Sequence, residues 1–193
     1  DLIELQSISA RTAFDILSDT VSSIASDAYL SSALTSFEGA SGLAPVWIMD
    51  FYSASEDRFY TASTSAIENP VIVERPNLSG RTPFQLTADW IDSDALMDSL
   101  ENIQRYPGEE QIKRTELFLG PFKVPFPADT ISSWQVFART SEGMRPFVAV
   151  TLAETGAEYT LPIGTAQDWL ASANNTAQAW SADAELIRIN SFG

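Results

Sequence analysis

The hydrophobic pattern of the first 37 residues is that of an amphipathic helix. The apolar positions follow one another in alternating steps of four and three and then continue along the same face: Ala10, Phe14, Leu17, Val21, Ile24, Ala28, Leu30, Leu34 and Phe37. Serine and aspartate fill most positions between them, and Gly39 ends the pattern. The pattern predicts one long helix over residues 1–38 that packs along a sheet. The same apolar seam is also suited to pairing two chains in a homodimer.

Strand-like segments follow this helical pattern. Residues 45–52 form a nearly continuous apolar run rich in aromatic side chains, residues 53–57 are polar, and residues 58–63 return to an apolar texture. This order predicts a β-hairpin with a five-residue connection. Residues 71–73 lie between Pro70 and Pro76 and predict a further short strand.

The rest of the chain mixes both textures. Residues 77–84 read as a turn-rich loop, and residues 84–105 predict one or two short helices. Extended segments are expected at 117–124, with a break at Gly120-Pro121, and at 134–139, 147–152 and 159–163. A helix over 165–180 and a strand-like run over 184–190 close the chain.

This order predicts an α+β fold with a long N-terminal helix packed on a central antiparallel sheet and further short helices. We expect a single domain over 1–193. It consists of the long helix (1–38), a sheet with inserted helices and loops (44–163), and a C-terminal helix and strand (165–193).

The charge of the chain limits the classes of partner that it can bind. Twenty-six acidic and 11 basic residues give a net charge of −15 over 193 residues. Such a surface repels phosphate backbones and anionic lipids, so we expect no nucleic-acid partner and no role at a membrane surface. The excess of acids serves either solubility or an acidic docking surface.

Two residue types are missing from the composition. The chain has no cysteine and no histidine. This excludes thiol nucleophiles, disulfides, Cys/His zinc sites and imidazole as a catalytic base. No run of 18 apolar residues is present, and the chain begins at Asp1 without a signal peptide, so we expect a mature or excised piece of a longer protein.

Carboxylates are the plentiful catalytic group. Asp89, Asp92 and Asp94 cluster around Trp90, and two carboxylates beside an aromatic ring could hydrolyse a glycoside. A solvated helix face or a helix N-cap explains the same acids. The Asp92-Ser93-Asp94 segment also lacks the third ligand and the central glycine of a calcium loop. We therefore expect no enzymatic activity, no cofactor and no metal site.

Arginines beside aromatic residues point to ligand binding. Arg81 lies near Phe84, Arg139 ends the segment that contains Trp134, and Arg145 precedes Pro146-Phe147. An arginine against an aromatic wall suits a small molecule with a carboxylate, through a bidentate contact. The predicted ligand-binding residues are Arg81, Phe84, Trp134, Arg139 and Tyr60. Alternatively, the arginines pair with surface acids and Trp134 belongs to the core.

The layout resembles the Cache-type (PDC, PAS-like) extracytoplasmic sensor domains of bacterial and archaeal receptors. Three parts carry the resemblance: the hairpin over 46–63, the loop Asn77-Leu78-Ser79-Gly80-Arg81-Thr82-Pro83-Phe84, and the closing strands at 118–122, 134–139 and 147–152. The loop is similar to the family's Asp-x-Ser-x-Arg pattern, with Asn77 in place of the aspartate.

The resemblance implies a PAS-like fold and a ligand-sensing role outside the cytoplasm. It implies a parent chain that is anchored in the membrane, a small-molecule ligand held between the sheet and the 77–84 loop, and a kinase, cyclase or chemotaxis output. The alternatives are a secreted or cell-surface interaction module with an exposed apolar patch, and a carboxylate hydrolase with two acids that face each other in a cleft.

Overall fold

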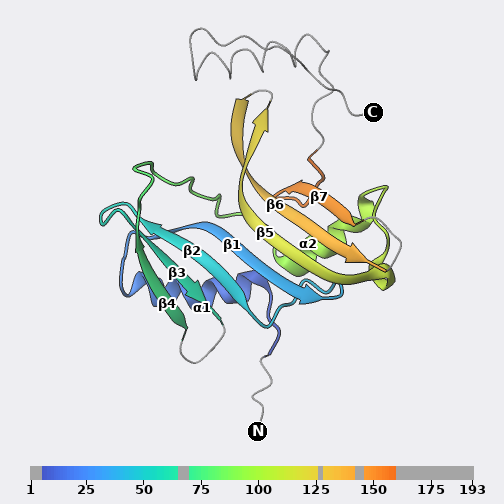
Figure 1. Cartoon of the computed structure of the whole chain (residues 1–193), viewed down its shortest axis with the longest axis horizontal. Helices are drawn as coiled ribbons and strands as arrows, with labels where there is room; N and C mark the ends of the chain where they lie inside the picture. Colours follow the sequence, from blue (N-terminus) through green and yellow to red (C-terminus); the bar gives the residue numbers. More distant parts are fainter. Residues whose placement is uncertain (1–5, 65–69, 126–127, 142–145, 160–193) are drawn as a thin grey trace. The chain divides into compact units, whose positions relative to one another are not determined.

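Seven strands form one antiparallel sheet in the computed structural model, which describes residues 6–64, 70–125, 128–141 and 146–159. The strand order across the sheet is β4-β3-β2-β1-β5-β6-β7 (Figure 1). The strands are β1 (Tyr29–Glu38), β2 (Trp47–Ser53), β3 (Arg58–Ser63), β4 (Val71–Pro76), β5 (Ile112–Pro125), β6 (Ala128–Thr140) and β7 (Phe147–Leu152). Two α-helices, α1 (Ala10–Ser22) and α2 (Ser93–Ser99), accompany them, with short 3₁₀ turns at Leu100–Asn102 and Glu109–Gln111. The predicted α+β class with an antiparallel sheet is confirmed.

The chain divides into two compact units. The first contains residues 1–121 and 132–159, and the second contains residues 122–131 and 160–193. Both described α-helices and most of the sheet belong to the first unit. In the second unit the structure describes the ends of β5 and β6. The predicted helix over 165–180 and the strand-like run over 184–190 lie outside the described residues.

The predicted long helix is wrong beyond residue 22. Helix α1 has 13 residues; it begins after the N-cap Ser9, whose hydroxyl accepts a hydrogen bond from the backbone N–H of Thr12. Residues 29–38 form strand β1, in which Ala33, Thr35 and Phe37 are buried while Leu34 faces the opposite side. A strand between β2 and β5 gains backbone hydrogen bonds along both edges, and this pairing prevails over the helical spacing.

The predicted hairpin over 45–63 is confirmed, because β2 and β3 pair in antiparallel register across the polar turn. The extended segments expected at 134–139 and 147–152 lie in strands β6 and β7, which also pair with each other in antiparallel register. The expected break at Gly120-Pro121 is wrong, because β5 continues through both residues. The pairing of β5 with β1 ends at Leu119, so the missing N–H of Pro121 interrupts no hydrogen bond to β1.

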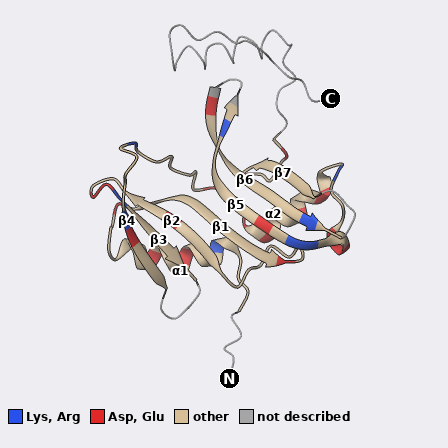
Figure 2. Ribbon diagram, viewed as in Figure 1, with Lys and Arg blue, Asp and Glu red and all other residues tan. Residues whose placement is uncertain are grey.

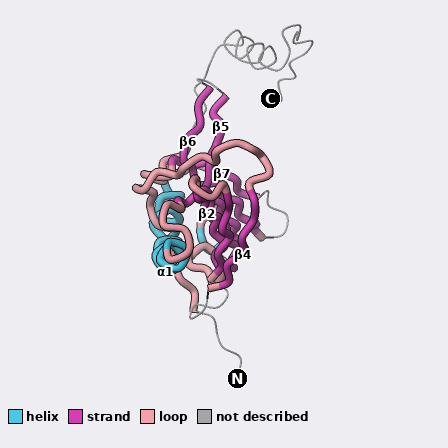
Figure 3. Tube along the Cα trace, turned by 90° about the vertical axis from the view of Figure 1, so that its left-hand side faces the viewer, coloured by secondary structure: helices cyan, strands magenta, loops and turns pink. Residues whose placement is uncertain are grey.

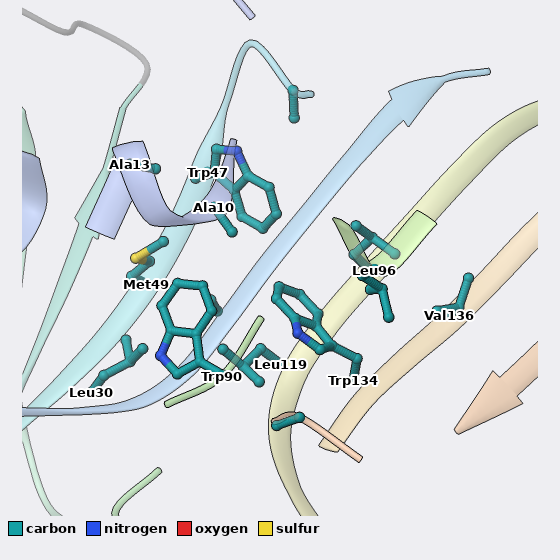
Figure 4. Close-up of a cluster of buried hydrophobic side chains, with 14 of the residues drawn as sticks. Ala10, Ala13, Leu30, Trp47, Met49, Trp90, Leu96, Leu119, Trp134 and Val136 are labelled. Carbon is teal, nitrogen blue, oxygen red and sulfur yellow. The ribbon is translucent and has the colours of Figure 1, made fainter. Parts of the chain in front are cut away.

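Both helices cover the same face of the sheet, as Figure 3 shows for α1. The core lies between them and the sheet, and three tryptophans meet in it edge to face (Figure 4). The ring centroid of Trp134 lies 6.4 Å from that of Trp47 and 6.0 Å from that of Trp90. The apolar face of α1 is buried in this core, with Ala10, Leu17 and Val21 fully covered. The expected packing of the helix along the sheet is therefore confirmed for residues 10–22.

Candidate functional site

A pocket of about 320 Å³ lies on the helix-covered face of the first unit. It opens between α1, the first residues of β1, and the segment that precedes α2. Its lining residues are Arg11, Phe14, Ser18, Ser22, Ala28, Tyr29, Leu30, Phe51, Gln85, Leu86, Thr87, Ala88 and Trp90. We call it the helix–loop pocket. Its volume is at the lower end of the range for small-molecule sites, which is about 300–1,000 Å³.

Aromatic rings form much of the pocket wall. Phe14 projects from α1, stacks on Phe51 of β2 at 6.1 Å between ring centroids, and meets Trp90 edge to face at 5.8 Å. Phe51 and Trp90 are almost fully buried, whereas Phe14 is half-buried. Two rings are thus fixed by the core, and the third belongs to a helix that borders the pocket.

Arg11 is the positively charged residue of this wall. Its guanidinium carbon lies 3.5 Å from the centroid of the Trp90 ring, and the group donates hydrogen bonds to the backbone carbonyls of Trp90 and Ala88. A guanidinium has five N–H donors, so donors remain for a ligand. Stacking on Trp90 holds the group in place before any ligand arrives.

Tyr29 adds a polar group at the pocket wall. Its hydroxyl donates a hydrogen bond of 2.9 Å to the carbonyl of Pro83, which ties strand β1 to the end of the 77–84 loop. Burial raises the pKa of Tyr29 above 10.0, so the hydroxyl stays protonated at neutral pH. The lining also contains the hydroxyls of Ser18, Ser22 and Thr87, but no aspartate or glutamate. The polar groups of the lining are therefore hydroxyls, the amide of Gln85 and the guanidinium of Arg11.

Asp92 has a structural role beside this pocket. Its carboxylate accepts hydrogen bonds from the Ser9 hydroxyl at 2.6 Å, from the Arg11 backbone N–H at 2.9 Å and from the Ser93 backbone N–H at 2.7 Å. It therefore caps α2 and joins the first turns of both helices. The helix-cap interpretation of this acid is confirmed. Among the described residues, no group of three or more Asp, Glu, His or Cys is placed to hold a metal ion.

The five predicted ligand-binding residues do not meet. Trp134 and Tyr60 are buried, the former donating its indole N–H to the carbonyl of Ile91 and the latter its hydroxyl to Glu56. Phe84 is half-buried against the core, while Arg81 and Arg139 are exposed on different parts of the chain. None of the five lines the helix–loop pocket, and no hydrogen bond, ion pair or ring contact joins any two of them within the described ranges.

The structure instead combines an arginine and an aromatic ring that are 79 residues apart. Arg11 and Trp90 are not neighbours along the chain; the hydrogen bonds that join the start of α1 to Asp92 bring them together. One local indication existed: Arg11 and Phe14 are three residues apart and share a helix face, with the guanidinium 5.8 Å from the ring.

Comparisons of the chain with protein-family models, with curated proteins and with solved structures find no match. No helix in the described part of the chain is both long and apolar enough to cross a membrane.

Proposed function

We propose that this chain is a ligand-binding sensor module and that it binds a small aromatic molecule with a carboxylate or similar acceptor in the helix–loop pocket. The observation that carries the proposal is the Arg11 guanidinium, stacked on Trp90 at the wall of a pocket lined by Phe14 and Tyr29. Aromatic walls with a few converging polar groups are the usual composition of small-molecule sites.

The wider sensor role belongs to the same proposal. The PAS-like assignment, the location outside the cytoplasm and the membrane-anchored parent receptor rest on the resemblance of the hairpin and of the 77–84 loop to Cache-type domains. The proposed pocket is bounded by residues 85–88 and by Trp90, directly after that loop. A ligand would change the position of α1, since Phe14, Ser18 and Ser22 all line the pocket. Signalling requires that the ligand bind one position of α1 more tightly than another.

A thermal-shift titration of the full chain tests ligand binding. Benzoate and indole-3-acetate are the probes, and benzyl alcohol is the uncharged comparison. Binding at 100 times the dissociation constant stabilises the folded state by about 2.7 kcal/mol. We expect stabilisation by the two carboxylates and a much smaller shift with benzyl alcohol.

Two variants locate the site. Ser22→Phe fills the pocket from α1, and Ser26→Phe places the same side chain at an exposed position outside it. We expect Ser22→Phe to abolish the probe-induced shift and Ser26→Phe to retain it. Arg11→Lys keeps the positive charge but loses the planar guanidinium, so it should weaken binding of the two carboxylates more than binding of benzyl alcohol. A shift that survives Ser22→Phe, or no shift with any probe, contradicts the proposal.

The second candidate is an interaction module without a small-molecule ligand. It is favoured by the sheet face opposite the helices, where Leu34, Ile48 and Val148 are exposed in the described part of the chain. The two functions differ in the residues they need: a ligand sensor is sensitive to Ser22→Phe, and an interaction module is sensitive to substitutions on the open sheet face.

A further inference from the structure

The helices lie on one side of the sheet (Figure 3), and the face that α1 and α2 leave uncovered is apolar at its centre. We call it the open face and define it by the outward side chains of the strands within the first unit. Its exposed large residues are Leu34 (46% exposed), Ile48 (42%), Val71 (50%), Val73 (51%) and Val148 (50%). These side chains are five of the eight large hydrophobic residues that are exposed in the described ranges.

The strand registers place the apolar side chains side by side. Leu34 of β1 is paired with Ile48 of β2 on one side and with Phe118 of β5 on the other. Phe137 of β6 is paired with Val148 of β7. A shallow depression of about 240 Å³ lies here, lined by Leu34, Phe118, Phe137 and Val148 among others. The apolar surface thus extends across five neighbouring strands.

The charges on the open face are balanced, in contrast to the net charge of −15 for the whole chain. Its outward charged residues are three arginines and three carboxylates: Arg75, Arg114, Arg139, Glu38, Asp50 and Glu116. Arg75 contacts Asp50 at 2.9 Å, and Arg114 lies 4.0 Å from Glu116. In Figure 2, basic residues lie where β5 begins and β6 ends, with acidic residues close to them along the chain. Two copies of the chain can therefore meet here without bringing an excess of like charges together.

We propose that the open face binds a second copy of this chain and forms a symmetric dimer of two sheets packed face to face. A face with equal numbers of opposite charges, four of them already in ion pairs, around an apolar centre can pack against a second copy of itself, as a twofold interface requires. Two sheets packed in this way lie about 10 Å apart, with their outward side chains interdigitated. Elsewhere the chain is strongly acidic, so other surfaces of two copies repel each other.

The area of the open face corresponds to a small interface. Six strand spacings of about 4.8 Å, over about 20 Å of strand length, give about 600 Å² per copy. The total of about 1,200 Å² is at the lower end of specific interfaces. A dimer of this size forms reversibly and depends on protein concentration. This inference is independent of the helix–loop pocket, since no open-face residue named above lines it.

Sedimentation velocity of the full chain across concentrations tests the dimer. We expect a monomer–dimer equilibrium with a dissociation constant below about 1 mM. The double variant Ile48→Thr with Val148→Thr should weaken it at least tenfold, because both side chains are at the apolar centre. Leu78→Thr is the control, since Leu78 is 91% exposed and lies in the 77–84 loop, outside the strands that form the face. Added salt should tighten the dimer, because it screens the repulsion between two chains of charge −15.

A second measurement identifies what covers the face. The chain has no cysteine, so Leu34→Cys provides a single labelling site, with Leu78→Cys as its control. Added wild-type chain should slow maleimide labelling at position 34 and leave position 78 unchanged. If labelling at position 34 is slow at every protein concentration, another part of the same chain covers the face. If it is fast at every protein concentration, a second copy does not cover the face and a different partner is its occupant. Either result, or a monomer at about 1 mM, overturns the proposal.

Discussion

Two tyrosine hydroxyls on the helix-covered side of the sheet have opposite environments. The hydroxyl of Tyr60 donates to the carboxylate of Glu56, whereas the buried hydroxyl of Tyr106 has no hydrogen-bond partner in the described part of the chain. An unpaired buried hydroxyl destabilises the folded state. We expect Tyr106→Phe to leave the free energy of unfolding unchanged or to raise it by up to about 1 kcal/mol, and the matched Tyr60→Phe to lower it. Urea unfolding measures both.

Tyr106 also makes stability depend on alkaline pH. Burial, followed by the charge of Glu109, raises the pKa of Tyr106 from 10.0 to about 12. Because the pKa is higher in the folded state, the unfolded chain loses the Tyr106 proton first. The free energy of unfolding is therefore unaffected by this group below pH 10 and falls as the pH rises towards 12. The difference in stability between Tyr106→Phe and the wild type should therefore grow in favour of the variant above about pH 10. An identical alkaline decline in both chains would contradict this assignment.

At the scale of elements, the turn after β1 fits closely against the start of α2. Gly42 has φ +72°, and a Cβ atom built there would lie 2.4 Å from the carbonyl oxygen of Ser93. The Ser93 hydroxyl in turn donates to the carbonyl of Gly42 at 2.6 Å and accepts from the backbone N–H of Ala10. This turn therefore positions both helices against the sheet.

Gly39 provides a matched control for Gly42. Its φ is +75°, but an added Cβ atom would meet nothing within 4 Å. Alanine at either position has a similar backbone strain of about 1–2 kcal/mol. We expect Gly42→Ala to lower the free energy of unfolding by about 1–3 kcal/mol more than Gly39→Ala does, because the turn must move away from α2. Chemical denaturation of both variants measures the difference. Equal losses for the two variants would show that α2 adjusts freely.

The sequence predicted best those elements whose pattern permitted one interpretation. The hairpin over β2 and β3 combines a short apolar run with a polar turn, and the structure has it in the predicted place. The segment 29–38 satisfied two periods at once: Leu30, Leu34 and Phe37 have helical spacing, while Ala33, Thr35 and Phe37 alternate as in a strand. Pairing with β5, about 80 residues later, decided between them, and such a partner is not visible in a local window.

The candidate site was less predictable than the fold for a related reason. Arg81 and Arg139 were chosen for their neighbours along the chain, but a binding wall is assembled from distant segments. Arg11 reaches Trp90 because Asp92 binds the first turn of α1, and that hydrogen bond joins residues 81 positions apart. The residue types that a pocket needs can be read from the sequence, but the hydrogen bonds of Asp92 between the starts of α1 and α2 determine which of them meet.

At the scale of the whole molecule, the excess of 15 negative charges opposes compaction. Surface ion pairs act in the other direction, but Arg58–Glu74, Arg75–Asp50 and Arg105–Glu158 are all partly exposed and contribute about 0–1 kcal/mol each. Repulsion among the remaining acids extends over a Debye length of about 30 Å at 0.01 M salt and about 10 Å at 0.1 M. Added salt should thus remove more repulsion than attraction.

We therefore expect the urea midpoint of the chain to rise between about 0.01 and 0.3 M NaCl. The measurement is made at low protein concentration, where the proposed dimer is dissociated and cannot contribute. KCl at the same ionic strength should give the same rise, which separates screening from the binding of a particular ion. A midpoint that falls with salt would mean that attraction in the surface ion pairs outweighs repulsion from the net charge. The rest of the surface would then repel a second copy no more strongly than the open face does.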